Sequence, residues 1–199
     1  MLLLYLIIDC PKDIEIKIPN FSNPITDDIE LTVPFTAQNE NNTSLEIYEP
    51  YQDNTYTTNE KNETSVSKTL RIGYGTETIT RGGQVRRVQE GDQITKEEAI
   101  DDLKRILKDV TKPFVVKELN KRGVNFEKLQ PKVQVVILDI AYNYGGDHKT
   151  LYSTFLTAIQ KDSITNSTGA LIQELERRAA MGAGQVPRRR RQEINYLRG

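Results

Sequence analysis

A glycine-flanked tyrosine in the run Ile72-Gly73-Tyr74-Gly75 is the feature of this 199-residue chain that most directly suggests a binding site. Glycines inside a strand-like run let another backbone or a ligand approach closely. Farther along, Thr95 and Glu98 have the spacing of a capping box, which starts a helix. A glycine-rich strand, a polar hairpin and a capped helix in this order indicate a cleft, although a Gly-x-Gly pair by itself is more typical of an ordinary bulge or turn.

The composition of the chain argues against several kinds of chemistry. A single histidine, His148, argues against a histidine-based triad or a histidine-ligated metal, and a single cysteine, Cys10, excludes an intrachain disulfide. Lys and Arg number 27 against 28 Asp and Glu, and this balance gives no general attraction for nucleic acid or anionic lipid. We therefore expect no metal, no cofactor, no nucleic-acid partner and no membrane partner.

The N-terminal region has strand-like patterns. Met1–Ile8 is apolar but too short to span a bilayer, so we expect a buried strand there, with a truncated signal segment as the alternative. Ile14–Ile18 and Ile29–Val33 alternate apolar and polar residues with a period of two, which is typical of strands. These patterns predict a β-rich arm over residues 1–37, which is too small to hold a core and suits docking onto the main domain or a partner.

The second half of the chain has helical spacing. Apolar residues over 99–110 recur at intervals of three and four, and we expect Pro113 to close that helix and open the next. The apolar segment Val133–Ala141 predicts a buried central helix that ends at the glycine pair 145–146. Further helices are expected over 151–159, 171–181 and 188–197. The sequence thus predicts an α+β fold, with a small β-hairpin front lobe and a helical back lobe in one domain over residues 38–199.

In this order the motifs resemble the phage-type lysozymes, glycoside hydrolase family 24. The runs that begin at Ile72 and at Gly91 are similar to that family's glycine-rich strand and to the start of the helix after it. Three later segments continue the similarity: Gln134–Gly145 with the central helix, Leu151–Leu156 with the helix that follows, and Gly184–Glu193 with the closing arginine-rich motif. The resemblance covers residues 44–199 and implies a lysozyme-like fold.

The resemblance also implies an activity. The protein would be a muramidase, a peptidoglycan hydrolase that cleaves the β-1,4 bond between N-acetylmuramic acid and N-acetylglucosamine. This chemistry needs a general acid whose pKa is raised by dry surroundings, and a second polar group that orients water or stabilises an oxocarbenium-like transition state. The implied partner is bacterial peptidoglycan and the implied location is a phage virion or the host cell wall and periplasm. The arm over residues 1–37 favours a virion-associated member that docks on other virion or tail proteins.

The family places its acid at the end of its first helix, a tyrosine seven residues later and an aspartate two residues after the tyrosine. One register puts the acid at Glu49, since Tyr56 lies seven residues on, and Thr58 then takes the place of the aspartate. The other register matches Tyr51 and Asp53 to the tyrosine and the aspartate, but leaves a serine where the acid belongs. Glu49 and Asp53 are therefore the candidate catalytic residues, and the alternative is that both are solvated surface carboxylates.

The same motifs imply four substrate-binding residues: Arg71, Tyr74, Thr76 and Asn143. Arg71 stands where the family has threonine and Thr76 where it has histidine, and the stretch over 59–68 resembles an insertion. These departures favour the alternative function, a catalytically weakened lysozyme-like structural or wall-binding component of a phage virion. For Asn143 the alternative is a helix cap or a structural hydrogen bond.

The arginine run 188–191 allows two interpretations. Four consecutive arginines could bind an anionic wall polymer or nucleic acid. The family resemblance favours the other interpretation, in which two of them bond within the C-terminal lobe and the others are solvated.

Overall fold

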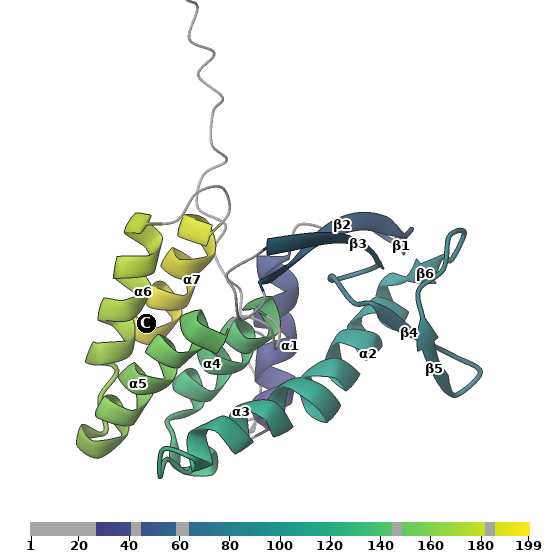
Figure 1. Cartoon of the computed structure of the whole chain (residues 1–199). Coiled ribbons are helices and arrows are strands. Elements are labelled where there is room, and N and C mark those ends of the chain that lie inside the picture. The colour runs from purple at the N-terminus through teal and green to yellow at the C-terminus, as the bar shows by residue number, and fades with distance from the viewer. Residues whose placement is uncertain (1–26, 41–44, 59–63, 145–148, 182–185) are drawn as a thin grey trace, which may run out of the picture.

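The computed structural model describes residues 27–40, 45–58, 64–144, 149–181 and 186–199. These ranges form helices α1 (Asp28–Asn39), α2 (Lys96–Ile106), α3 (Lys112–Asn120), α4 (Pro131–Tyr144), α5 (Lys149–Thr165), α6 (Gly169–Met181) and α7 (Val186–Arg198), with a π-helical turn over Leu107–Thr111 and a 3-10 turn over Phe126–Lys128. The strands are β1 (Ile47–Tyr48), β2 (Tyr51–Thr58), β3 (Thr64–Arg71), β4 (Thr78–Arg81), β5 (Gln84–Arg87) and β6 (Ile94–Thr95). Figure 1 shows the strands gathered at one end and helices α4 to α7 at the other, which confirms the predicted α+β class.

The first described element is a helix, so the strand predicted for Ile29–Val33 is wrong. Asp27 caps α1 by accepting a hydrogen bond from the Ile29 amide at 2.9 Å. Ile29 and Val33 are four residues apart and both are buried, because this spacing also places them on one helix face, which packs against α4. The predicted boundary between residues 37 and 38 falls inside this helix, and the rest of the predicted arm, residues 1–26, lies outside the described residues.

The strands form hairpins and one short pairing, all antiparallel. β2 and β3 pair residue by residue from Tyr51–Arg71 to Thr58–Thr64, so much of the apparent insertion belongs to a long hairpin, whose tip over 59–63 lies outside the described residues. β4 pairs with β5, and β1 pairs with β6. In Figure 1 the β2–β3 hairpin extends over the region between α1 and α2.

The glycine run after β3 is a tight turn and not the predicted strand. Ile72 and Thr76 form a single antiparallel bridge, and the amides of Gly75 and Thr76 both donate to the Ile72 carbonyl at 3.1 Å. Gly73 and Gly75 have φ values of +59° and +91°, a region that residues with a Cβ rarely adopt. The glycines are therefore required by the backbone of the turn itself.

A nearly continuous helical segment, α2 to α3, connects the two ends of the molecule (Figure 1). It starts with the predicted capping box: Thr95 Oγ1 accepts from the Glu98 amide at 3.3 Å, and Glu98 Oε2 accepts from the Thr95 amide at 2.8 Å. The expectation that Pro113 opens the second helix is confirmed, whereas the first helix, α2, ends earlier, at Ile106. The π-helical turn Leu107–Thr111 continues the coil, and Pro113 enters at the start of α3, where its missing N–H is tolerated.

The centre of the helical end is α4. Every residue from Val133 to Ala141 is buried, as expected for a helix that is apolar nearly all round. Helices α1, α3, α5 and α7 pack around it. The three later helices predicted from spacing are confirmed as α5, α6 and α7, whereas the glycine pair 145–146 lies outside the described residues.

Candidate functional site

A pocket of about 670 Å³ lies between the end of α1, the first strands and the glycine turn. Its lining residues are Glu40, Leu45, Ile47, Glu49, Tyr51, Gly73 and Gln93. Carboxylates from two different segments meet in this pocket. Pairs of carboxyl groups with different surroundings are what acid–base chemistry on a glycosidic bond requires.

Another concavity, of about 750 Å³, lies between α5 and α6. The carboxylate that lines it, Glu174, accepts hydrogen bonds from Arg177, Arg178 and Thr154. These donors hold the pKa of Glu174 at about 2, although burial acts in the opposite direction. A carboxylate that is ionised and saturated in this way is structural, so this concavity is the weaker candidate.

Glu40 is the C-cap residue directly after α1, and its side chain lines the pocket. Its backbone amide donates to the carbonyls of Thr36 and Ala37, which completes the last turn of the helix. Its carboxylate accepts a hydrogen bond from Arg189 Nη1 at 2.6 Å and is 23% exposed. Burial raises the pKa of Glu40 above its usual value, and the positive charge of Arg189 opposes that rise only in part. Glu40 is therefore partly shielded from water, and the resulting rise of its pKa suits a general acid.

Arg189 is itself held by a second carboxylate. Its Nε and Nη2 atoms donate to Asp139 at 3.1 and 2.7 Å, and Thr36 Oγ1 donates to the same carboxylate at 2.8 Å. Burial alone would raise the pKa of Asp139, but the charge and hydrogen bonds of Arg189 outweigh it and keep the pKa low. Since Asp139 already neutralises the guanidinium, Arg189 fixes the position of Glu40 without fully stabilising its charge.

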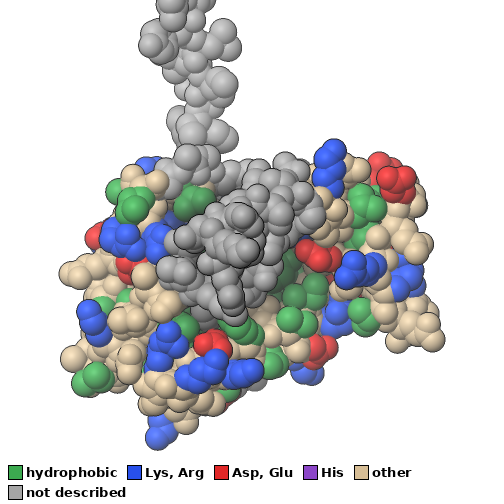
Figure 2. All heavy atoms as spheres, viewed as in Figure 1, with side chains coloured by type: hydrophobic (Ala, Val, Ile, Leu, Met, Phe, Trp, Pro, Cys, Tyr) green, Lys and Arg blue, Asp and Glu red, His purple; other side chains and the backbone are tan. Residues whose placement is uncertain are grey.

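The arginine run bonds within the helical end, as the resemblance favoured. Arg189 and Arg190 are buried, whereas Arg188 and Arg191 are exposed. The Arg190 guanidinium lies 2.9 Å from Glu193 and 5.3 Å from the ring centroid of Tyr144. On the face shown in Figure 2, Lys and Arg side chains are scattered among acidic ones.

Glu49, the predicted acid, lines the same pocket as Glu40 but is exposed. Gln93 Nε2 donates a hydrogen bond to its Oε1 at 2.9 Å. The position in the pocket agrees with a role in chemistry. The solvated surroundings do not suit a group that must stay protonated.

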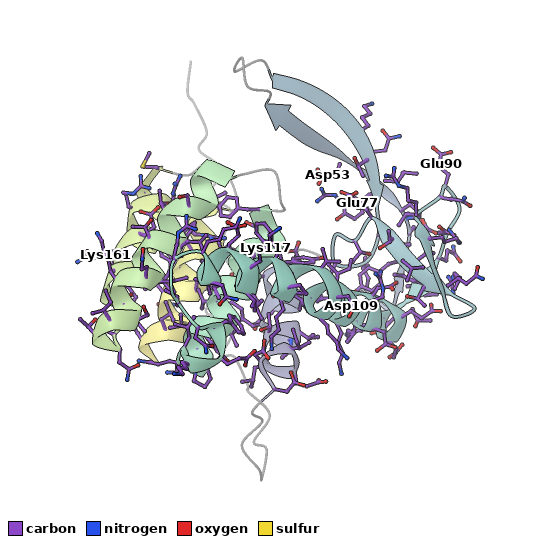
Figure 3. All side chains as sticks on the ribbon, turned by 60° about the horizontal axis from the view of Figure 1, so that its bottom comes forward. Asp53, Glu77, Glu90, Asp109, Lys117 and Lys161 are labelled. Carbon is purple, nitrogen blue, oxygen red and sulfur yellow. The ribbon has the colours of Figure 1, made fainter. Side chains whose placement is uncertain are left out.

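Asp53 lies on β2 in an ion pair with Arg71, which faces it from β3 at 3.1 Å. Arg71 also contacts Glu77 at 3.3 Å, and Figure 3 shows Asp53 and Glu77 close together at the base of the hairpin. All three side chains are partly exposed. Thr58, the other candidate for the second role, lies at the far end of β2, where it pairs with Thr64.

The remaining predicted binding residues support the structure around the pocket and do not line it. Tyr74 is buried, and its hydroxyl accepts a hydrogen bond from Tyr48 at 3.2 Å. Thr76 is buried, and its hydroxyl donates to the Ile72 carbonyl at 3.3 Å. Asn143 accepts a hydrogen bond from Arg190 at 3.3 Å, the structural alternative considered for it.

Sequence reasoning missed Glu40 because it treated the preceding residues as a strand, and so left the chain without a first helix. The available signal was a spacing of three and four residues after the N-cap Asp27, which is typical of one face of a helix. The residues at this spacing, all buried in the structure, are Ile29, Thr32, Val33 and Thr36. A helix predicted from this spacing would place Glu40 near its C-terminal end.

No model of a known protein family matches the chain, and no curated protein or solved structure is significantly similar to it. In the described part of the chain, no helix is long and apolar enough to cross a membrane. Among the same residues, no group of three or more His, Cys, Asp or Glu side chains is placed to hold a metal ion.

Proposed function

We propose that this protein has a lysozyme-like fold and is a muramidase, which cleaves the β-1,4 bond between N-acetylmuramic acid and N-acetylglucosamine in peptidoglycan. The observation that carries the proposal is Glu40, a half-buried carboxyl directly after the first described helix, which lines a pocket and has a raised pKa. Its place matches the position that the resemblance implies for the acid. The setting that goes with this activity is a phage virion or the host cell wall.

The spacing implied by the resemblance supports a second assignment. The family's aspartate comes two residues after a tyrosine that is itself seven residues after the acid. Counted from Glu40, the aspartate position is Glu49, and the tyrosine, Tyr48, comes one residue late. Glu49 then takes the second catalytic role in place of the first.

The two carboxyl groups divide the reaction between them. Protonated Glu40 donates its proton to the glycosidic oxygen as the bond from that oxygen to the anomeric carbon breaks. Ionised Glu49 accepts a proton from the water whose oxygen attacks the same carbon. Each carboxyl ends in the opposite protonation state, and exchange with solvent restores both.

A second candidate function is a wall-binding component without hydrolysis. The observation that favours it is the Asp53–Arg71–Glu77 cluster, in which the candidate Asp53 is already paired with an arginine that stands in place of the family's threonine. If the protein only binds, the pocket still recognises the glycan but no bond is cut.

The test is hydrolysis of purified cell walls, followed by loss of turbidity and release of reducing ends. We expect wild type to be active and Glu40→Gln to lose about 100- to 10,000-fold, the usual contribution of a general acid. Glu49→Gln should lose activity as well. The matched control is Asp109→Asn, which should behave as wild type because Asp109 is an exposed carboxylate on the π-helical turn.

Two results would contradict parts of the proposal. Wall binding without any release of reducing ends by wild type would favour the binding component. Equal activity of wild type and Glu40→Gln would show that another residue is the acid.

A further inference from the structure

Three oxygen atoms from three separate elements converge over the α-carbon of Gly75. A Cβ placed on this glycine would lie 3.7 Å from Tyr51 Oη, 3.8 Å from Tyr142 Oη and 3.9 Å from Glu40 Oε2. The contributing elements are β2, α4 and the residue after α1. Glycine therefore leaves a methyl-sized space beside the carboxyl of Glu40, surrounded by polar atoms.

The Tyr142 hydroxyl is committed to the protein. It donates a hydrogen bond to the Tyr74 carbonyl at 2.6 Å, which ties α4 to the glycine turn. Burial raises the pKa of Tyr142, so the hydroxyl keeps its proton and the hydrogen bond persists. Tyr142 thus forms a fixed wall of the space over Gly75.

The Tyr51 hydroxyl differs from that of Tyr142 because its proton is available. Within the described part of the chain it makes no hydrogen bond, and the residue is 38% exposed and lines the pocket with Glu40. Burial and the nearby charge of Glu40 raise the pKa of Tyr51, so it is a donor and not a base at neutral pH. An uncommitted donor next to a catalytic acid is suited to a substrate oxygen.

We propose that Tyr51 is a further catalytic residue, whose hydroxyl donates a hydrogen bond to a sugar oxygen that occupies the space over Gly75, next to the bond that Glu40 protonates. This inference rests on the proposed muramidase activity. The donor holds the sugar so that its glycosidic oxygen stays within reach of the Glu40 proton while the bond breaks. Asp53 is held by Arg71 and is not needed for this step.

The experiment uses soluble, uncross-linked peptidoglycan strands, so that kcat and KM can be measured separately. Tyr51→Phe removes one oxygen that has no partner in the described fold, so we expect an unchanged midpoint of thermal unfolding. We expect kcat to fall by about 10- to 100-fold, the effect of one lost hydrogen bond in a transition state, with KM within about twofold of wild type. Tyr196→Phe on α7, whose ring packs against Phe35, is the matched control and should keep wild-type kcat.

Gly75→Ala provides an independent test of the space. Its methyl group would fill the position between the three oxygens, and we expect kcat to fall at least as far as in Tyr51→Phe. Because Gly75 has a φ of +91°, this variant is also strained, and the conclusion depends on Tyr51→Phe if it does not fold.

The outcomes separate the two proposals. Full kcat in Tyr51→Phe, together with loss of activity in Glu40→Gln, overturns the role of Tyr51 and leaves the muramidase proposal intact. A raised KM with unchanged kcat also overturns it, since the hydroxyl would then act in binding alone. No cleavage by wild type overturns the proposed function, and this inference with it.

Discussion

Arg189 and Arg71 each hold two carboxylates near the same pocket, but in different surroundings. Arg189 is 8% exposed and bridges Glu40 and Asp139, whereas Arg71 is 29% exposed and bridges Asp53 and Glu77. Water reaches the second cluster, whereas Arg189 and Asp139 in the first are shielded from it, so ion pairs of the same kind differ in their effect on stability and on pKa. Partial burial raises the pKa of Glu40, and Arg189, whose charge Asp139 already balances, lowers it only in part, so Glu40 suits the role of acid.

The largest difference between the two clusters should appear in stability. Arg189→Met would leave Asp139 buried without its counter-charge, and we expect the free energy of unfolding to fall by about 3–5 kcal/mol. Urea denaturation at pH 7 measures this change. The double variant with Asp139→Leu removes both charges and should recover most of the loss, and a cost below 1 kcal/mol for Arg189→Met would contradict the assignment of a buried pair.

Substitutions in the two clusters should also shift the pH dependence of activity in opposite directions. Only protonated Glu40 can act, so the alkaline limb of kcat/KM follows its pKa. Asp139 raises this pKa by its charge, so Asp139→Asn should move the limb to lower pH. Arg71 lowers the same pKa, so Arg71→Met should move the limb to higher pH.

Profiles of kcat/KM between pH 4 and 9 measure both shifts. The Asp109→Asn variant is the control, because its side chain is exposed and does not contribute to the pKa of Glu40. Shifts of the same sign in the Asp139 and Arg71 variants would rule out Glu40 as the group that controls the limb.

The smallest expected effect is the contribution of the exposed cluster to the free energy of unfolding. Arg71→Met breaks contacts to Asp53 and Glu77, which are 44% and 50% exposed, and we expect a loss of about 0–1 kcal/mol. The difference from wild type should shrink as salt is raised to 1 M, because salt screens exposed charges. If Arg71→Met lowered the free energy of unfolding as much as Arg189→Met does, the difference in exposure would not explain the different contributions of the two clusters to stability.

Local patterns were predictable wherever short-range physics decides them. The capping box at Thr95 and Glu98 and the buried helix Val133–Ala141 follow from the side chains of adjacent turns, and the structure has both. The segment Ile29–Val33 was ambiguous, since its apolar residues satisfy strand and helix spacing alike. Packing against α4 and the cap at Asp27 favour the helix.

By itself, the sequence determined the α+β class, the central helix and the order of segments that forms the basis of the resemblance. Only the tertiary structure decided which carboxyl of the pocket is partly shielded from water. The pKa of Glu40 depends on desolvation by distant segments and on Arg189, which lies at the other end of the chain. No local pattern records such contacts, because a pKa is set by the solvent and charges that surround a group in space and not by its neighbours in sequence.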